Sequence, residues 1–250
     1  DNSKALAEYG KGKLEAQKKP SEAFELGWIS PGSILDEGPN PYTVMAQYHY
    51  PKRHITNLTK AFRACGVNIV SVLLAEMALA ALFEQYKSEF SDPDYLILET
   101  GYLNNPNSLT TGFWYKRNIL NNITSYKTGI MTVIKTLESF YKDLTEAEIR
   151  EMLFSCGAFR EYQTEEAKDI LEMRGINADE WYAVCTREFH AYMLTLSNDI
   201  NGKKAEKIDE IILTGEICLI PGLEKVFREK YKLPVRCWEN EYELALDKKT

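Results

Sequence analysis

Continuous apolar stretches and stretches with helical spacing follow one another along most of the chain. Apolar or β-branched runs predict strands at 25–29, 41–50, 67–72, 95–100, 109–116, 118–124, 209–214 and 233–238. Amphipathic spacing predicts helices at 3–19, 54–65, 73–87, 129–142, 145–155, 165–174, 177–198 and 221–231. Strand–helix units with one antiparallel excursion indicate α/β architecture.

Local signals mark several element ends. Gly66 follows the helix at 54–65 as a C-terminal cap. Thr145 and Glu148 have the spacing of a capping box, which predicts a helix start. The break at Tyr50 and Pro51 indicates a small α/β part before a larger domain with a central mixed sheet.

Composition and charge exclude several classes of protein. The 250 residues are 44% hydrophobic and 27% charged, as in globular proteins. The net charge is −7 and no long Lys/Arg run is present, so we expect no nucleic-acid partner. No apolar stretch has transmembrane length, so we expect no direct membrane insertion.

The potential metal ligands are scattered. The five cysteines form no C-x-x-C pair, which indicates reduced, mostly buried thiols in a cytosolic protein. The three histidines have no Asp or Cys at the spacing of a triad or a metal site. We therefore predict no catalytic triad and no metal site.

One segment resembles a known family. Residues 208–235 read IDEIILTGEICLIPGLEKVFREKYKLPV. They resemble the signature of the actin-like (sugar kinase/Hsp70/actin) superfamily, in particular the branch of the type IV pilus assembly protein PilM and the cell-division protein FtsA. The matches are Leu213–Gly215, Pro221–Leu223 and Pro234–Val235, and the departure is Glu216, where the family has a second glycine.

The resemblance implies a fold and a domain division. The fold would be an actin-like (ribonuclease H-like) mixed sheet with flanking helices and a small inserted α/β subdomain, called 1C. Residues 1–65 would be the 1C-like assembly subdomain. Residues 66–250 would be the actin-like domain, mainly its second half. The family's first phosphate loop is not found before Ser3, so half of the nucleotide cleft is expected to be missing.

The resemblance also implies nucleotide-binding positions. They are the second phosphate loop, the start of the following helix, a ribose-binding carboxylate and the glycine turn, and they fall on Glu99, Thr100, Gly101, Gly129, Glu188, Thr214, Gly215 and Glu216. The family has Asp where this chain has Glu99, and Glu216 adds bulk and negative charge near the phosphates. We expect no cofactor and no catalytic residue, with Mg-ATP as the alternative.

Glu188, Glu99 and the turn after the strand at 209–214 also have structural interpretations. Glu188 lies on a mostly apolar helix face, and a buried carboxylate needs a partner. It would therefore contact a ribose, form a salt bridge to a neighbouring domain, or lie at the edge of that face. Glu99 would be either catalytic or structural. The turn 215–222 would be either a phosphate cradle or a tight strand–helix connection.

The aromatic residues of the N-terminal part are the candidates for partner binding. They are Trp28, Tyr42, Tyr48 and Tyr50, with core packing as the alternative role.

The resemblance implies a cytoplasmic assembly platform of a type IV pilus or type II secretion machine. It would be held at the inner membrane by the tail of a PilN-like protein and contact other platform proteins, and self-association is left open. The alternative is an ATP-binding or ATP-hydrolysing factor of the FtsA type.

Overall fold

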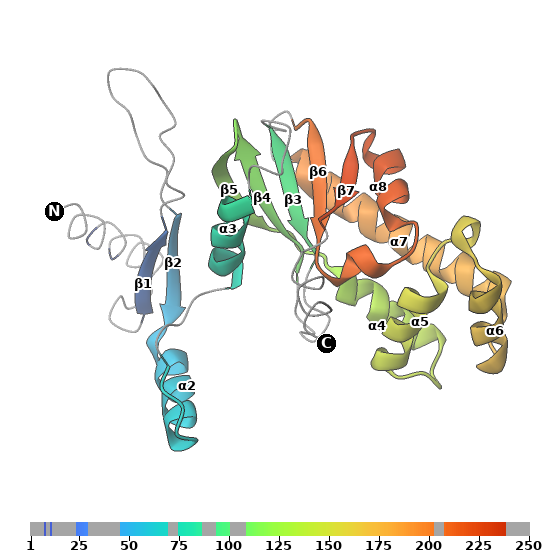
Figure 1. The fold of residues 1–250 in the computed structure, drawn as a ribbon, viewed down its shortest axis with the longest axis horizontal. Coiled ribbons are helices and arrows are strands. Elements are labelled where there is room, and N and C mark those ends of the chain that lie inside the picture. Colours follow the sequence, from blue (N-terminus) through green and yellow to red (C-terminus); the bar gives the residue numbers. More distant parts are fainter. Residues whose placement is uncertain are drawn as a thin grey trace, which may run out of the picture. The chain divides into compact units, whose positions relative to one another are not determined.

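The computed structural model describes residues 8, 11, 24–29, 46–69, 75–86, 94–100, 109–202 and 208–238. Two compact units, Asp1–Glu89 and Phe90–Thr250, make up the chain (Figure 1). Whether residues 1–65 form a separate assembly subdomain stays a prediction.

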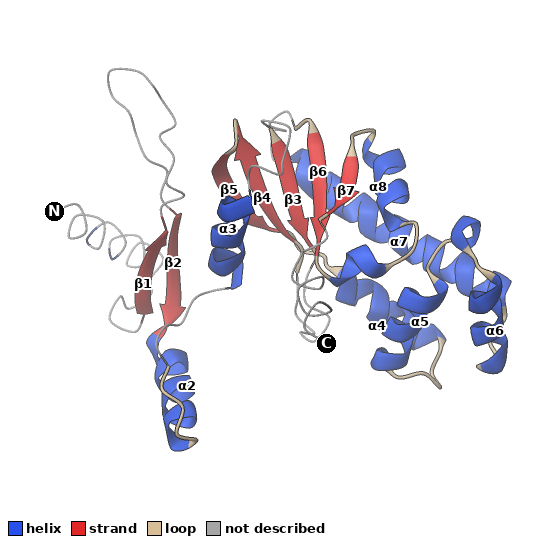
Figure 2. Ribbon diagram, in the orientation of Figure 1, coloured by secondary structure: helices blue, strands red, loops and turns tan. Residues whose placement is uncertain are grey.

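The first unit contains a two-stranded antiparallel sheet of β1 (Phe24–Ile29) and β2 (Ala46–Pro51). It is followed by α2 (Lys52–Ala64) and α3 (Ala75–Tyr86) (Figure 2). These elements confirm two predicted strands and two predicted helices. Residues 41–45 of the second predicted strand lie outside the described residues. The same holds for the predicted helix at 3–19, apart from Glu8 and Lys11, which are helical.

The strand predicted at 67–72 is wrong for its described part, because residues 67–69 have no regular structure. The end of α2 supplies the reason. Gly66, at φ +75°, donates its N–H to Arg63 O, and Val67 donates to Phe62 O at 2.9 Å. This pair of bonds is a Schellman motif. The Val67 N–H therefore completes the helix cap and is not available to a sheet.

The second unit is built on a five-stranded mixed sheet in the order β5-β4-β3-β6-β7. Its strands are β3 (Tyr95–Glu99), β4 (Thr111–Lys116), β5 (Ile119–Ser125), β6 (Glu210–Thr214) and β7 (Val235–Cys237). The pairs β3–β6 and β6–β7 are parallel, and β3–β4 and β4–β5 are antiparallel. All five strands were predicted. Arg117 and Asn118 have positive φ, as a two-residue hairpin turn between β4 and β5 requires.

Five α-helices accompany this sheet. They are α4 (Ile130–Phe140), α5 (Glu146–Cys156), α6 (Glu165–Met173), α7 (Ala178–Gly202) and α8 (Leu223–Tyr231). They confirm the predicted helices to within a few residues at each end. Two short 3₁₀ segments were not predicted, η3 (Arg160–Tyr162) and η4 (Glu216–Leu219). Within the described residues, no helix combines the length and the apolar character needed to cross a bilayer.

The core lies between the sheet and these helices. Trp181 on α7 is fully buried, and its indole Nε1 donates to Gly157 O at 2.9 Å. The neighbouring Tyr182 hydroxyl donates to Cys156 O at 2.9 Å. Both bonds fasten the first turn of α7 to the end of α5, so that every buried polar group of these two large side chains has a partner.

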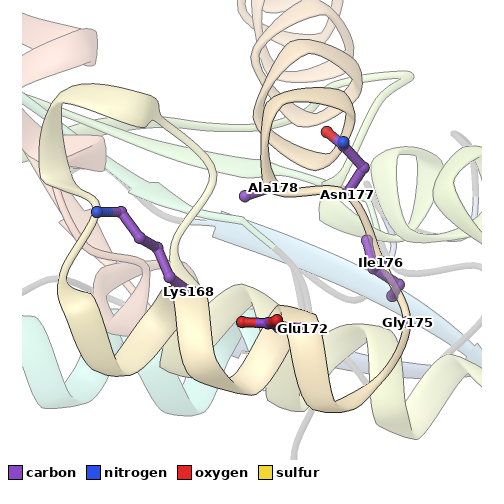
Figure 3. A pocket seen from close by; sticks show the side chains of 6 residues that line it. All are labelled: Lys168, Glu172, Gly175, Ile176, Asn177 and Ala178. Carbon is purple, nitrogen blue, oxygen red and sulfur yellow. The ribbon is translucent and has the colours of Figure 1, made fainter.

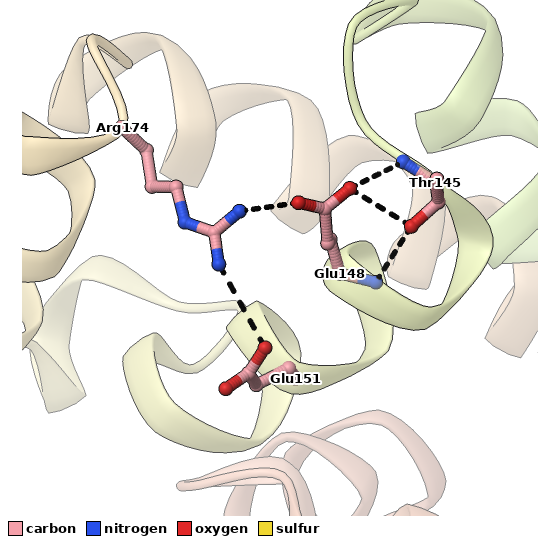
Figure 4. Close-up of polar contacts among 4 residues, drawn as sticks. All are labelled: Thr145, Glu148, Glu151 and Arg174. Atoms are coloured by element: carbon pink, nitrogen blue, oxygen red, sulfur yellow. Dashed lines mark hydrogen bonds and ion pairs between the residues drawn. The ribbon is translucent and has the colours of Figure 1, made fainter.

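The predicted capping box at the start of α5 is present (Figure 4). The Thr145 hydroxyl accepts from the Glu148 backbone N–H, and Glu148 Oε2 accepts from the Thr145 N–H at 2.9 Å. The other oxygen of Glu148 accepts from Arg174, just beyond α6, at 2.6 Å. The bonds from Thr145, and then the Arg174 guanidinium, lower the pKa of Glu148 from 4.5 to about 2.

We expect Glu148→Gln to lower the melting temperature by a few degrees at pH 7. A carboxylate with a lowered pKa stabilises the fold above its unfolded value near 4.5, and this stabilisation is lost as the pH falls toward 2. The difference between wild type and variant should therefore shrink between pH 4.5 and pH 2 in thermal melts. Glu151→Gln is the matched control, because Glu151 is 3.8 Å from Arg174 and 69% exposed. An equal difference at every pH would contradict the assignment.

Candidate functional site

The candidate site lies where β3 and β6 end. The two strands are parallel, and Glu99 is opposite Thr214 in register. Thr100 and Gly215 follow directly. A Cβ built on Gly215 would lie 3.6 Å from Glu99 Oε1 and 3.8 Å from Thr100 Oγ1. The structure therefore brings together four of the predicted nucleotide-site residues at the carboxyl ends of parallel strands, where ligands of α/β proteins gather.

Gly215 is needed for its backbone conformation. Its φ is +92°, which side-chain-bearing residues rarely adopt. The space around it would hold a Cβ in ordinary van der Waals contact. The turn after β6 therefore requires glycine for its dihedral angle and leaves the polar atoms of Glu99 and Thr100 directly beside the backbone.

Thr100 connects this corner to α4. Its carbonyl oxygen accepts from the Ile130 N–H at 3.2 Å, next to the predicted Gly129. Gly129 is the buried N-cap of α4, and its cap has no side-chain hydrogen bond. The Thr100 side-chain oxygen is buried and has no hydrogen-bond partner among the residues that the structure describes. A buried hydroxyl without a partner costs about 1–3 kcal/mol, so it marks a place where a polar group of a ligand would be favourable.

A second layer of polar groups supports the site and was not predicted. The Thr110 hydroxyl and the Tyr192 hydroxyl are 3.0 Å apart and buried. The Thr110 N–H donates to Thr128 O at 2.8 Å. Burial, and to a smaller extent the charge of Glu99, raises the pKa of Tyr192 above its ordinary value. Tyr192 therefore stays protonated and fastens α7 to the segment before β4.

Glu188 lies one turn before Tyr192 on α7. Its Oε1 is 2.8 Å from Arg187 Nε, and its side chain is 18% exposed. The Arg187 guanidinium also lies over the Phe140 ring, 4.8 Å from the centroid. This ion pair is with the neighbouring residue of the same helix, so both interpretations of Glu188, ribose contact and a salt bridge to a neighbouring domain, stay predictions.

Glu216 begins η4, directly after the glycine turn. The segment is a tight connection: the Cys218 N–H donates to Gly215 O at 3.1 Å, and the Ile220 N–H donates to Ile217 O at 3.1 Å. Glu216 is half-buried. The turn 215–222 is therefore a compact connection, and its role as a phosphate cradle stays a prediction.

The remaining predicted site residues lie elsewhere or outside the described part of the chain. Gly101 and Tyr42 are not among the described residues. Trp28 is in β1, and Tyr48 and Tyr50 are in β2, with Tyr48 opposite Gly27 in register. Their role in partner binding stays a prediction. Within the described ranges, no group of three His, Cys, Asp or Glu side chains is placed to hold a metal ion.

A separate open pocket of about 410 Å³ lies at the junction of α6 and α7 (Figure 3). Its lining residues are Lys168, Glu172, Gly175, Ile176, Asn177 and Ala178. It contains none of the predicted site residues. Asn177 directly precedes α7, and its Oδ1 accepts from the Glu180 N–H at 3.1 Å.

A comparison with solved structures finds chains with a similar fold. The PilM-PilN type IV pilus biogenesis complex contains a chain similar to this one, with a TM-score of 0.65 over 96% of this chain at 12% sequence identity. This chain spans 63% of the length of that chain. This chain has a PilM-like fold. The predicted resemblance and the predicted actin-like α/β fold class are confirmed at the level of the fold.

Two further structures are less similar. MreB 5 of Spiroplasma citri bound to AMPPNP has a TM-score of 0.48 at 14% identity, over 75% of this chain and 59% of that chain. The ethanolamine utilization protein EutJ from Carboxydothermus hydrogenoformans has a TM-score of 0.39 at 12% identity, over 79% and 76% of the two chains. No protein-family profile and no curated protein matches the sequence.

Proposed function

We propose that this chain is a cytoplasmic assembly-platform protein of a type IV pilus or a related type II secretion machine. It binds the cytoplasmic tail of a PilN-like inner-membrane protein and is held at the membrane through that partner. The observation that carries the proposal is the likeness to a chain of the PilM-PilN complex over 96% of the residues. A fold alone does not fix a function, so the proposal also rests on the candidate site and on the small sheet.

The candidate site favours a platform over a phosphotransfer enzyme. Glu216 carries a carboxylate beside Gly215, at the place where the family has a second glycine against the nucleotide. Glu99 is 6% exposed and ends β3 where the family has aspartate. Two carboxylates at the ends of β3 and β6 repel phosphate groups unless a cation lies between them.

The two-stranded sheet of the first unit is the proposed partner surface. A two-stranded hairpin is marginally stable by itself, and a third strand stabilises it. A peptide that adds to β1 or β2 in extended conformation would form main-chain hydrogen bonds along the strand, and side-chain pockets would give specificity. The tail of a membrane protein is an occupant of this kind.

We expect Trp28→Ala and Tyr48→Ala to weaken binding of the cytoplasmic N-terminal peptide of a PilN-like protein from the same organism. Truncation of an aromatic anchor costs about 2 kcal/mol or more, which is roughly a 30-fold rise in Kd. Fluorescence anisotropy with the labelled peptide measures the change. His190→Ala is the matched control, because His190 is an exposed residue of α7 in the other unit.

Circular dichroism of each variant accompanies these titrations, since a variant that unfolds loses binding for another reason. Full-strength binding by both folded variants would exclude this sheet as the partner surface. No binding of the peptide by the wild-type chain would overturn the proposed function itself.

Nucleotide binding is the second candidate function, and one observation favours it. The buried Thr100 hydroxyl, which has no hydrogen-bond partner in the described part of the chain, faces the same corner as the Glu99 carboxylate and the Gly215 backbone. A nucleotide with Mg²⁺ would provide a hydrogen-bond partner for Thr100 and a cation beside the carboxylates of Glu99 and Glu216. An ATP-binding protein of the FtsA type is the corresponding alternative.

We expect Mg-ATP at millimolar concentration to leave the melting temperature unchanged, because Glu216 and Glu99 disfavour phosphate. A ligand at 100 times its Kd stabilises the folded state by about 2.7 kcal/mol, so real affinity would be visible as a shift of several degrees. Differential scanning fluorimetry with Mg-ATP, Mg-ADP and Mg²⁺ alone makes the measurement. A shift with Mg-ATP only would favour the second function, and Glu216→Gly should not create one in this chain.

A further inference from the structure

Two cysteines meet at the edge of the sheet next to the candidate site. Cys237 is the last residue of β7, and the parallel pairing of β6 and β7 places it opposite Leu213. The following residue, Trp238, donates its N–H to Leu213 O at 2.8 Å. The end of β7 is therefore held alongside the end of β6.

Cys218 comes to the same place from the other direction. After β6 the chain passes through Gly215 into η4, and the Cys218 N–H donates back to Gly215 O at 3.1 Å. This turn keeps Cys218 next to the end of β6. The thiols of Cys218 and Cys237 are in hydrogen-bonding contact at this place.

An intramolecular disulfide requires a thiol that an oxidant can reach and a second cysteine close to it. Each of the other cysteines lacks one of these two requirements. Cys65 is exposed, and its own unit contains no second cysteine with which it could pair. Cys156 and Cys185 are buried, and burial raises the pKa of Cys156 to about 11 and that of Cys185 well above its ordinary value. Cys218 and Cys237 are half-buried and in hydrogen-bonding contact, so an oxidant has access to two neighbouring thiols.

We infer that Cys218 and Cys237 are a modification site, a dithiol that an oxidant of the peroxide class converts to a disulfide. In the first step the Cys237 thiolate attacks a peroxide oxygen, the O–O bond breaks, and a sulfenic acid and hydroxide are formed. In the second step the Cys218 sulfur attacks the Cys237 sulfenic sulfur, the S–O bond breaks and water leaves. Two thiols are oxidised and one peroxide is reduced to two molecules of water.

The contact assigns the two roles. The hydrogen bond to Cys237, followed by burial, raises the pKa of the Cys218 thiol. Cys218 is therefore an S–H donor at neutral pH, and a donor stabilises negative charge on the sulfur that accepts its hydrogen bond. We therefore place the attacking thiolate at Cys237 and the resolving thiol at Cys218. The rate should rise with pH, because the attacking species is a thiolate.

A cross-link here would fasten η4 to β7. The segment between the sulfurs includes all of α8, and η4 begins at Glu216 beside Gly215. The disulfide would therefore fix the turn that borders Glu99 and Thr100. This inference does not depend on the proposed function, since it concerns the chemistry of the thiol pair alone.

Peptide mapping of the full chain tests the pair. The chain is treated with hydrogen peroxide at pH 8, its free thiols are alkylated, and it is digested with trypsin. We expect the peptide 208–225 to appear linked to the peptide 237–248, with two hydrogens fewer than their sum. The oxidised chain should melt about 5–10 °C higher than the reduced chain, and dithiothreitol should reverse the gain.

Three variants control the assignment. Cys218→Ser and Cys237→Ser should each abolish the linked peptide and the rise in melting temperature, and Cys218→Ser should accumulate sulfinic acid at Cys237. Cys65→Ser removes another accessible thiol and should leave both readouts unchanged. Oxidation of Cys65 while the peptides 208–225 and 237–248 remain unlinked would overturn the inference, and so would cross-links that form only between chains.

Discussion

Gly222→Ala should be among the most destabilising single substitutions in this chain. The φ of Gly222 is +79°, and a Cβ there would lie 1.9 Å from Cδ2 and 2.2 Å from Cε2 of Tyr162. The left-handed conformation costs a residue with a Cβ about 1–2 kcal/mol, and overpacking adds about 1–3 kcal/mol. We expect a loss of about 3 kcal/mol or more in the free energy of unfolding, seen as a fall of about 6–12 °C in melting temperature.

Gly175→Ala separates the two causes of this loss. Gly175 has a φ of +70° and no heavy atom within 4 Å of its Cβ position, so its substitution measures the backbone cost alone. We expect it to lose about 1–2 kcal/mol. In the Gly222→Ala background, Tyr162→Ala should recover part of the difference between the two glycine variants. Equal losses for Gly222→Ala and Gly175→Ala would show that the Tyr162 ring moves aside without cost.

Gly112→Ala should destabilise the sheet for a reason that involves no backbone strain. Its Cβ would lie 2.8 Å from Cε2 and 2.9 Å from the hydroxyl of Tyr126, and 3.2 Å from Leu96 Cδ1. Tyr126 is 2% exposed, and its hydroxyl accepts from Trp114 Nε1 at 3.1 Å, so the ring is held in place. We expect a loss of about 2–3 kcal/mol in urea denaturation.

A double-mutant cycle with Tyr126→Leu tests the contact. If Gly112→Ala acts through the Tyr126 ring, the double variant should lose less stability than the two single variants together, by about 1 kcal/mol or more. Strict additivity would contradict the clash. The pKa of Tyr126 provides a second readout, because burial raises it to about 12. If Gly112→Ala pushes the Tyr126 ring toward solvent, a spectroscopic titration of that variant should show this pKa lowered toward 10.

Much of the second unit could be predicted from its sequence because its signals are local. The strands β3 and β6 are continuous apolar runs, as strands buried on both faces are. The start of α5 follows from the spacing of Thr145 and Glu148. The strand predicted at 67–72 is wrong at its described residues, 67–69. Their apolar composition suits a strand, but the Val67 N–H is bonded in the cap of α2 that Gly66 makes possible.

Only the residues of the candidate site that belong to short sequence motifs could be predicted. The motifs around Glu99 and Gly215 gave the residues that the parallel pairing of β3 and β6 brings together. The bond between Thr110 and Tyr192 joins residues 82 positions apart, and no local pattern connects them. The segment η4 was missed because a single 3₁₀ turn has no periodicity of its own.

The pairing of β3 with β6 also has a consequence for the order of folding. The paired residues Tyr95 and Glu210 are separated by most of the second unit, including the β4–β5 hairpin and the helices α4 to α7. Contacts of such long sequence separation form late, because the entropy of closing a long loop must be overcome before they contribute. During synthesis on the ribosome, β3 would emerge well before β6. The edge of β3 that pairs with β6 would stay unpaired until β6 is made. The corner that carries Glu99, Thr100 and Gly215 would then be among the last parts of the molecule to form, and the unpaired β3 edge is where a chaperone would be needed.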